Sequence, residues 1–239
     1  MHALLLATLL KAATVIVSGN VGASDLRDLV LVGVGTGVVV DRIDAHHYAI
    51  VTAAHVARYG NPHVAIYDHP NAHSPVEMVM TDPRGEDVAM LIVRSAAAMP
   101  IVALASHEPP SGARLEVVGH PYARTWTVTH AAYAQGAMPV SKSLRPLLTR
   151  DSSLWICRGC DRGNSGSGIY DAHGRLTALI YAAAPLPAYR AADAHELRTD
   201  TYNPHIVRQV LAIDAGEVRR LLRSAERSWR NSRKSPLER

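Results

Sequence analysis

Short apolar runs follow one another along most of the chain, and polar turn residues separate them. The runs are rich in Val, Leu, Ile and Ala, and β-branched residues favour strands. They lie at residues 29–34, 37–40, 48–52, 64–67, 76–81, 88–93, 115–118, 125–132, 154–157, 168–170, 176–182 and 206–213. Turn residues fill the gaps, for example at 109–112 and 171–174. This spacing predicts an all-β sandwich or barrel.

One helix is predicted near the carboxyl end. Asp214 occupies an N-cap position, and Glu217 would complete a capping box. Val218, Leu221 and Leu222 then form a helical apolar stripe. No internal repeat or interdomain linker is found, and we interpret the Ala- and Pro-rich stretch 183–200 as a surface loop.

The amino end allows two interpretations. Residues 3–10 form a short apolar run, and Val21–Ala23 would fit a signal-peptide cleavage site. However, Lys11 interrupts the apolar region and no Lys or Arg precedes it. The alternative is a helix followed by a first strand at Thr14–Val17. No apolar run reaches the roughly 20 residues of a transmembrane helix.

Composition is consistent with a single all-β unit. The chain has 239 residues, of which 48% are hydrophobic and none is Phe, so a sizeable core must be built from aliphatic side chains. The net charge is +4, but residues 217–239 hold eight Lys/Arg against three Asp/Glu, which leaves the remainder at −1. The basic tail is either a solvated terminus or a segment that binds nucleic acid or a membrane surface. For the domain itself we expect no nucleic-acid partner.

The chain contains one pair of cysteines, Cys157 and Cys160, in the sequence Cys-Arg-Gly-Cys. Two ligands do not make a structural zinc site, so we expect no metal. A thioredoxin-like redox motif would need a βαβ setting, which the Gly-rich surroundings do not supply. A local disulfide in an oxidising compartment and a reduced pair both remain open.

Three short motifs each contain one polar residue that acyl transfer needs. They are Thr52–His55, Asp87–Leu91 and Gly163–Ser167. A serine hydroxyl is a poor nucleophile until a base removes its proton, and that base needs an orienting carboxylate. The glycines of the third motif permit a tight turn that exposes the hydroxyl and directs backbone N–H groups toward an oxyanion. Each motif alone is weak, because such residues more often serve structure.

In this order the three motifs resemble the chymotrypsin/trypsin superfamily of serine proteases, and most of all its bacterial HtrA-like (Deg) branch. The sequence segments 33–40, 117–121 and 174–179 resemble the family as well. The resemblance implies two six-stranded antiparallel β-barrels with a short C-terminal helix, and no cofactor. It divides the chain into an N-terminal segment 1–28, a protease domain 29–223 and a basic tail 224–239. Because 16 residues follow Arg223, we expect no PDZ domain in this chain.

The resemblance also implies a role for each matched residue. Ser165 would be the nucleophile, His55 the general base and then the acid, and Asp87 the group that orients His55. The backbone N–H groups of Gly163 and Ser165 would form the oxyanion hole. The implied activity is that of a serine endopeptidase acting on polypeptides.

Two departures from the family pattern lie beside the serine. Asn164 stands where digestive trypsins have an Asp that pairs with a newly cleaved amino terminus, so we expect no such activation step. Ser167-Gly168 replaces the usual Gly-Pro, with an effect that the sequence does not indicate.

The resemblance places the primary substrate pocket as well. One wall would contain Tyr181, Ala182 and Ala183, and residues 159–162 would lie near its base. The alanines would suit a medium aliphatic side chain, whereas Asp161 would attract a basic one. Both alternatives remain open.

Two other functions compete with the protease hypothesis. The first is a catalytically inactive binding or scaffold protein on the same fold, because fold alone does not fix function. The second is a redox protein that uses Cys157 and Cys160. We favour a secreted or periplasmic location over a cytoplasmic one, and the oligomeric state is left open.

Overall fold

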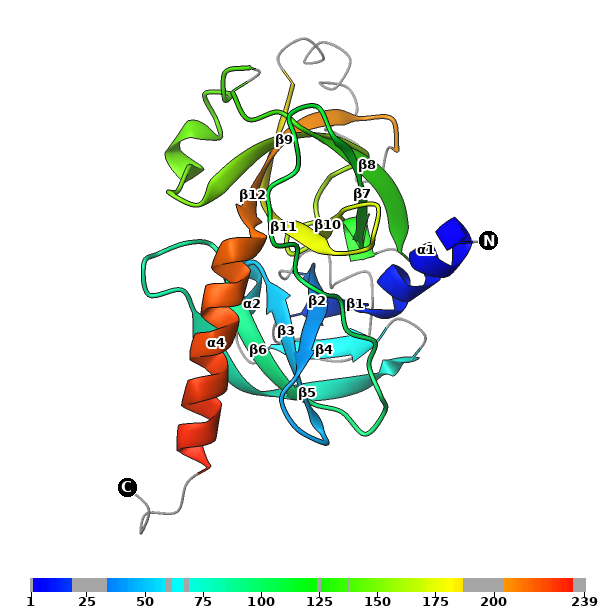
Figure 1. Ribbon diagram of the computed structural model, residues 1–239, viewed down its shortest axis with the longest axis vertical. Helices are drawn as coiled ribbons and strands as arrows, with labels where there is room; N and C mark the ends of the chain where they lie inside the picture. The colour runs from blue at the N-terminus through cyan, green and yellow to red at the C-terminus, as the bar shows by residue number, and fades with distance from the viewer. Residues whose placement is uncertain are drawn as a thin grey trace.

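The computed structural model describes residues 2–18, 34–58, 62–66, 69–123, 126–136, 138–186 and 204–233. Two closed barrels of six antiparallel strands lie one against the other (Figure 1), which confirms the predicted fold class. The first has the order β1-β2-β3-β6-β5-β4 and the second the order β10-β11-β12-β9-β8-β7. Their strands are β1 Thr14–Ser18, β2 Val34–Arg42, β3 His47–Thr52, β4 His63–Ile66, β5 His69–Thr81, β6 Ala89–Arg94, β7 Arg114–Gly119, β8 Thr127–Tyr133, β9 Ser152–Arg158, β10 Gly168–Tyr170, β11 Leu176–Pro185 and β12 Val207–Asp214.

Helices occupy the ends of the chain and a few connections. The longer ones are α1 His2–Ala12 and α4 Ala215–Ser232, and short helical turns are α2 Ala54–Ala57, η2 Pro121–Ala123 and η3 Arg145–Leu147. β1 pairs with both β2 and β4 and closes the first barrel. Cleavage after residue 23 would therefore remove a barrel strand. The boundaries at residues 28 and 223 stay a prediction.

Two strands differ from the sequence prediction. The runs 29–34 and 37–40 were predicted as separate strands; residues 29–33 lie outside the described residues, and the rest form one strand, β2. β5 begins at His69, so the loop predicted before residue 76 is wrong. There Pro75, Ser74 and His73 pair with β4, because backbone pairing overrides the weak strand propensity of these residues.

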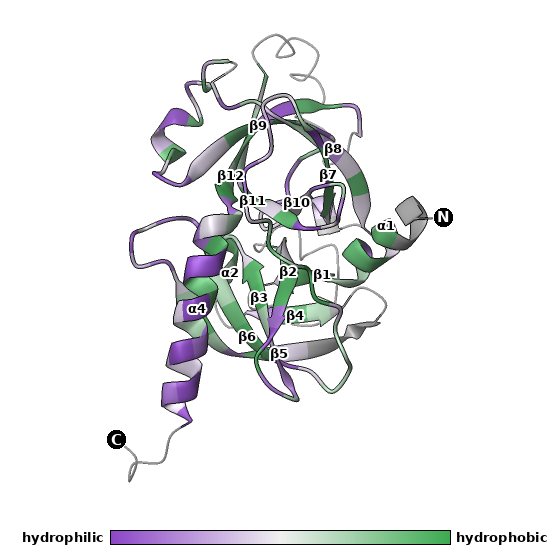
Figure 2. Ribbon diagram, viewed as in Figure 1, coloured by the Kyte–Doolittle hydropathy of each residue, from purple (hydrophilic) through white to green (hydrophobic). Residues whose placement is uncertain are grey.

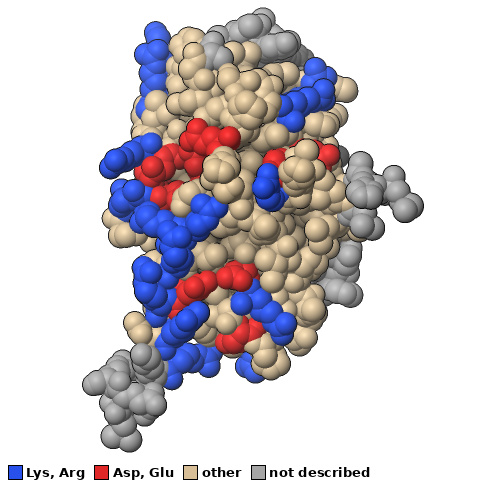
Figure 3. All heavy atoms as spheres, viewed as in Figure 1, with Lys and Arg blue, Asp and Glu red and all other residues tan. Residues whose placement is uncertain are grey.

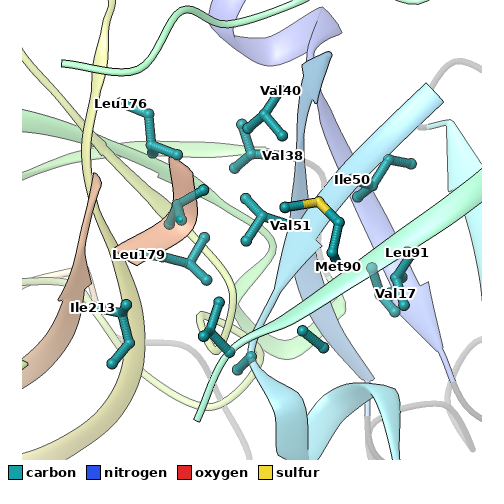
Figure 4. Close-up of a cluster of buried hydrophobic side chains, with 14 of the residues drawn as sticks. Val17, Val38, Val40, Ile50, Val51, Met90, Leu91, Leu176, Leu179 and Ile213 are labelled. Atoms are coloured by element: carbon teal, nitrogen blue, oxygen red, sulfur yellow. The ribbon is translucent and has the colours of Figure 1, made fainter. Parts of the chain in front are cut away.

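The core is built from aliphatic side chains and continues from the first barrel into the second. Figure 4 shows side chains from both barrels meeting in this cluster. All of them are buried: Val17, Val38, Val40, Ile50, Val51, Met90, Leu91, Leu176, Leu179 and Ile213. A second cluster around Trp155 fills the second barrel and includes Cys157 and Cys160, which are joined by a disulfide. Burying both barrels against each other fixes the junction where the candidate site lies.

Helix α4 begins where the sequence predicts, but not through a capping box. The side chain of Asp214 makes no bond to the helix N–H groups and instead accepts a hydrogen bond of 2.6 Å from the Ser153 hydroxyl. Glu217 pairs with Arg84 and Arg220 rather than with the N-cap. The predicted capping box is therefore wrong, because Ser153 binds the first carboxylate and two arginines bind the second.

The two faces of α4 differ in chemistry. Its apolar residues, including Val218, Leu221 and Trp229, are buried against the body of the protein. Its outer side is polar, in contrast to the largely apolar strands of the first barrel (Figure 2). Arg223, Arg227 and Arg230 are exposed, and Lys and Arg cover the side of the molecule along which α4 runs (Figure 3). Part of the predicted basic tail is thus the outer face of a packed helix.

None of the helices in the described residues has the length and apolar character needed to span a bilayer. That same part of the chain holds no cluster of three or more His, Cys, Asp or Glu side chains arranged to bind a metal ion.

Asp214 generates a prediction about pH and stability. Burial raises the pKa of Asp214 from 3.8 to about 6, and the charges of Glu108 and Asp151 act in the same direction. The folded protein then binds this proton more tightly than the unfolded chain does. Protonated Asp214 therefore contributes fully to the free energy of unfolding below about pH 4, and this contribution is lost as the pH rises through 6. Replacing Asp214 with Asn should stabilise the protein, relative to wild type, by up to about 3 kcal/mol more at about pH 7.5 than at about pH 4. Urea unfolding at both pH values measures this, and a difference that does not change with pH would contradict it.

Candidate active site

His55 and Asp87 meet at the edge of the first barrel. β3 ends at Thr52 and leads into α2, which carries His55, while Asp87 lies just before β6. Thr52 is paired with Ala89, so the neighbouring strands bring the two side chains together. The His55 Nδ1 atom lies 2.7 Å from Asp87 Oδ2, and the His55 backbone N–H donates to Asp87 Oδ1 at 2.8 Å. Both carboxylate oxygens are therefore fixed by one residue.

This contact favours one charge state of Asp87. Burial alone would raise the pKa of the Asp87 carboxyl, but the hydrogen bonds and charge of His55, with the charge of Arg58, lower it overall. An ionised carboxylate accepts a hydrogen bond from Nδ1–H, and in that tautomer the Nε2 atom of a neutral imidazole is free to accept a proton. The His55 side chain is 39% exposed, so an incoming substrate can reach it.

Helix α4 anchors the loop that leads into Asp87. The Asp82 carboxylate is fully buried and accepts the backbone N–H groups of Arg84 at 3.1 Å and Glu86 at 3.2 Å. It also pairs with Arg220 of α4 at 2.6 Å. A charged group in the interior is tolerated only when paired and hydrogen-bonded, and this one is. The position of Asp87 thus depends on α4 as well as on the first barrel.

Ser165 comes from the second barrel and lies against β2 of the first. Its backbone oxygen accepts the N–H of Thr36 at 2.8 Å. A Cβ atom added to Gly35 would lie 2.8 Å from that same oxygen and 2.5 Å from a methyl carbon of Val56, the residue after His55. The serine backbone and the turn with the histidine therefore meet over Gly35. Among the described residues no hydrogen bond joins the Ser165 hydroxyl to His55, and such bonds often tighten only when substrate binds.

The peptide group between Arg162 and Gly163 has a fixed direction. The Arg162 carbonyl accepts the N–H of Tyr122 at 2.7 Å. In a trans peptide the N–H points away from the C=O, so the Gly163 N–H is directed to the opposite side. Gly163 has a φ of +90°, and Tyr122 is the one described residue other than glycine with a positive φ, at 53°.

The peptide group before Ser165 is held in the same way. The Asn164 carbonyl accepts the N–H of Ser167 at 2.9 Å, and the Asn164 N–H donates to the Asp161 carbonyl at 3.0 Å. In the described part of the chain, the N–H groups of Gly163 and Ser165 have no acceptor. Two backbone donors are therefore available to an oxygen bound beside the serine.

The Asn164 side chain is satisfied within its own loop. Its Nδ2 donates to the Ser167 hydroxyl at 3.2 Å, and its Oδ1 accepts the Asp161 N–H at 3.1 Å. A neutral amide in this position needs no ammonium partner, and the absence of an amino-terminal activation step stays a prediction. A Cβ at Gly119 would lie only 1.9 Å from the Ser167 hydroxyl. The unusual Ser167 thus packs against β7 and binds Asn164.

The residues assigned to the pocket wall differ in accessibility. Tyr181 is only 4% exposed, and its hydroxyl donates to the Leu147 carbonyl at 2.8 Å and lies 2.7 Å from the Ser152 hydroxyl. Ala182 is half-buried and Ala183 is exposed. The alanines, not the tyrosine ring, therefore present surface at this position.

Asp161 is not solvent-facing. Its side chain is 10% exposed and accepts a hydrogen bond of 3.1 Å from Arg208, which is itself 6% exposed. The charge of Asp161 is therefore compensated within the protein. The sequence does not point to Arg208, Tyr122 or Thr36, because each is hydrogen-bonded to a residue that is distant in the chain.

Comparison with known proteins agrees with this architecture. Residues 35–179, more than half of the chain, match the model of the trypsin-like peptidase domain. The chain is similar to the Rv3671c protease from M. tuberculosis in its active form, with 20% identity, a TM-score of 0.62, and coverage of 91% of this chain and 82% of that one. An inactive serine-to-alanine mutant of the same protease gives 20% identity, a TM-score of 0.60, and coverage of 92% and 89%.

A second solved protease is similar as well. The serine endoprotease from Yersinia pestis has 16% identity and a TM-score of 0.60, with coverage of 93% of this chain and 65% of that one. At such identities the likeness shows the fold. The comparison with curated proteins finds no match.

Gly166 provides a test of how closely the serine loop, residues 163–167, packs on β2. A Cβ there would lie 1.8 Å from the Thr36 carbonyl oxygen, whereas nothing lies within 4 Å of a Cβ at Gly112; φ is +87° at the first and +78° at the second. Gly112→Ala therefore isolates the cost of the backbone conformation, about 1–2 kcal/mol. Gly166→Ala should cost about 1–3 kcal/mol more in the free energy of unfolding, because the loop must move. Equal costs in a urea titration would show that the close approach is absent.

Proposed function

The chain belongs to the trypsin-like peptidase family, and from this premise we propose that it is a serine endopeptidase that works through an acyl-enzyme. The observation that supports the proposal most is the pair formed by His55 and Asp87, at 2.7 Å, beside a serine loop with two unused backbone donors. A base with a fixed tautomer and a prepared oxyanion site are the parts that activate a serine.

In the proposed acylation step, Ser165 Oγ attacks the carbonyl carbon of the scissile peptide bond. His55 Nε2 takes the hydroxyl proton, and ionised Asp87 stabilises the imidazolium that forms. The carbonyl oxygen becomes an oxyanion and accepts hydrogen bonds from the N–H groups of Gly163 and Ser165. His55 then gives the proton to the leaving nitrogen, the C–N bond breaks, and an ester with Ser165 remains.

Deacylation repeats the sequence with water. His55 removes a proton from a water molecule, whose oxygen attacks the ester carbonyl carbon. The same two N–H groups stabilise the second oxyanion. The C–O bond to Ser165 breaks, the proton on His55 returns to Ser165 Oγ, and the new carboxyl end of the product leaves.

For substrate choice we propose a medium aliphatic side chain before the scissile bond. Arg208 compensates the charge of Asp161, which weakens the case for a basic side chain, and Ala182 and Ala183 leave an apolar wall. Apolar pockets discriminate modestly, so we expect a preference of roughly tenfold in kcat/KM over Lys or Arg. Profiling with a peptide library measures it, and a preference for Lys or Arg would contradict it.

Ser165→Ala tests the proposed function directly. Loss of the attacking oxygen should lower turnover by about 10⁶-fold, as in other triads whose serine is removed, and should abolish labelling by a fluorophosphonate probe. Ser111→Ala, on an exposed turn of the second barrel, is the control and should label like wild type.

Two outcomes would overturn the proposal. Labelling or hydrolysis that persists in Ser165→Ala would show that another group is the nucleophile. A folded wild-type protein that neither labels nor hydrolyses peptides would favour the inactive binding protein instead.

A further inference from the structure

Thr36 lies in β2 of the first barrel, yet its hydrogen bonds reach both halves of the site. Its N–H donates to the Ser165 carbonyl at 2.8 Å, and its hydroxyl donates to the Gly163 carbonyl at 2.9 Å. The same hydroxyl accepts the backbone N–H of His120 at 3.0 Å. Its own carbonyl accepts the hydroxyl of Thr52 at 2.7 Å. Thr36 is fully buried, so water does not replace any of these bonds.

The serine loop lies against Thr36 with no space between them. A Cβ on Gly166 would sit 1.8 Å from the Thr36 carbonyl oxygen and 2.6 Å from the Thr52 hydroxyl. On the other side, a Cβ on Gly163 would sit 2.5 Å from the His120 carbonyl and 2.8 Å from the Tyr122 nitrogen. The loop is therefore clamped between β2 and the turn that begins at His120, and Thr36 bonds to both.

The Thr36 hydroxyl holds Gly163, one of the two glycines of the loop. Gly163 has a φ of +90°, and a glycine exchanges such a conformation for others at little steric cost. The peptide before it is held by Tyr122, and the peptide after it by the bond from Thr36 to the Gly163 carbonyl. Without that hydroxyl the Gly163 carbonyl loses its donor, and the Gly163 N–H is then held from one side only, by the bond between the Tyr122 N–H and the Arg162 carbonyl.

The hydrogen bonds of Thr36 also lead toward His55. Thr52 is the last residue of β3, three positions before His55, and its hydroxyl is bonded to the Thr36 carbonyl. We propose that Thr36 is a positioning residue, whose hydroxyl aligns the Gly163 oxyanion donor with the histidine-bearing strand of the other barrel. This inference rests on the proposed function and names a further determinant of the same site.

A merely structural role must be distinguished from positioning. Thr36→Val removes the hydroxyl at nearly constant shape, and Thr36→Ser keeps it. Thr177→Val is a matched control, because Thr177 is also buried in the described structure and its hydroxyl donates to the Ile169 carbonyl at 2.9 Å, away from the site. If Thr36 positions the donor, Thr36→Val should lower kcat about 10- to 100-fold, less than the 10²- to 10³-fold of losing an oxyanion donor outright.

In Thr36→Val, KM should change less than about twofold. The affinity of this variant for a peptidyl boronate, which mimics the tetrahedral intermediate, should fall by the same factor as kcat/KM. Thr36→Ser should stay within about threefold of wild type in both. Thr177→Val should lose thermal stability but keep kcat and boronate affinity.

The inference is overturned if folded Thr36→Val retains wild-type kcat, or if Thr177→Val loses as much. If Thr36→Val does not fold, Thr36→Cys replaces it, because a thiol is a weak donor of similar size. The kcat of Thr36→Cys should lie between that of Thr36→Ser and that of Ser165→Ala, and a wild-type kcat in Thr36→Cys would overturn the inference. Failure of the proposed function is distinct: wild type and Ser165→Ala would then behave alike, whatever Thr36 does.

Discussion

The close contact between the serine loop and β2 is the constraint on which the site depends. The two barrels contribute different groups, so the proposed chemistry requires that they dock in one relative position. At Gly166 the chains approach so closely that a single Cβ would reach 1.8 Å from the Thr36 oxygen. Such an approach permits only backbone and a small hydroxyl at the junction. It explains why Gly166 follows Ser165 and why β2 carries Gly35 beside Thr36.

Electrostatics position the other half of the site. Asp87 lies at the end of a loop whose buried Asp82 is bonded to two backbone N–H groups and to Arg220. Glu217 pairs with Arg220 and Arg84, and it is itself buried in α4. Removing one partner from such a cluster leaves an unpaired interior charge, which is far more costly than losing a surface ion pair. α4 is therefore part of the support of the Asp87 carboxylate, which is hydrogen-bonded to His55.

The sequence predicts features that depend on local conformation. The strands around His55 and Asp87 follow from continuous aliphatic runs, and the contact between these two residues follows from the pairing of β3 with β6. The sequence does not predict partners that only the tertiary fold brings together. The Thr36 hydroxyl and the Gly163 carbonyl are 127 positions apart, and Arg208 and Asp161 are 47 apart. The capping box fails partly for this reason, because the distant residues Ser153 and Arg84 bind its carboxylates, and Arg220, one turn along α4, binds Glu217 as well.

The most direct test of this account is a crystal structure of the protein after reaction with a peptidyl fluorophosphonate. We predict a covalent bond from Ser165 Oγ to phosphorus, and a phosphonyl oxygen about 2.7–3.1 Å from the nitrogens of both Gly163 and Ser165. His55 would remain bonded to Asp87, and the Thr36 hydroxyl to the Gly163 carbonyl. An adduct on another residue, or a phosphonyl oxygen that contacts neither nitrogen, would contradict the central claim that the docked barrels assemble a working serine site.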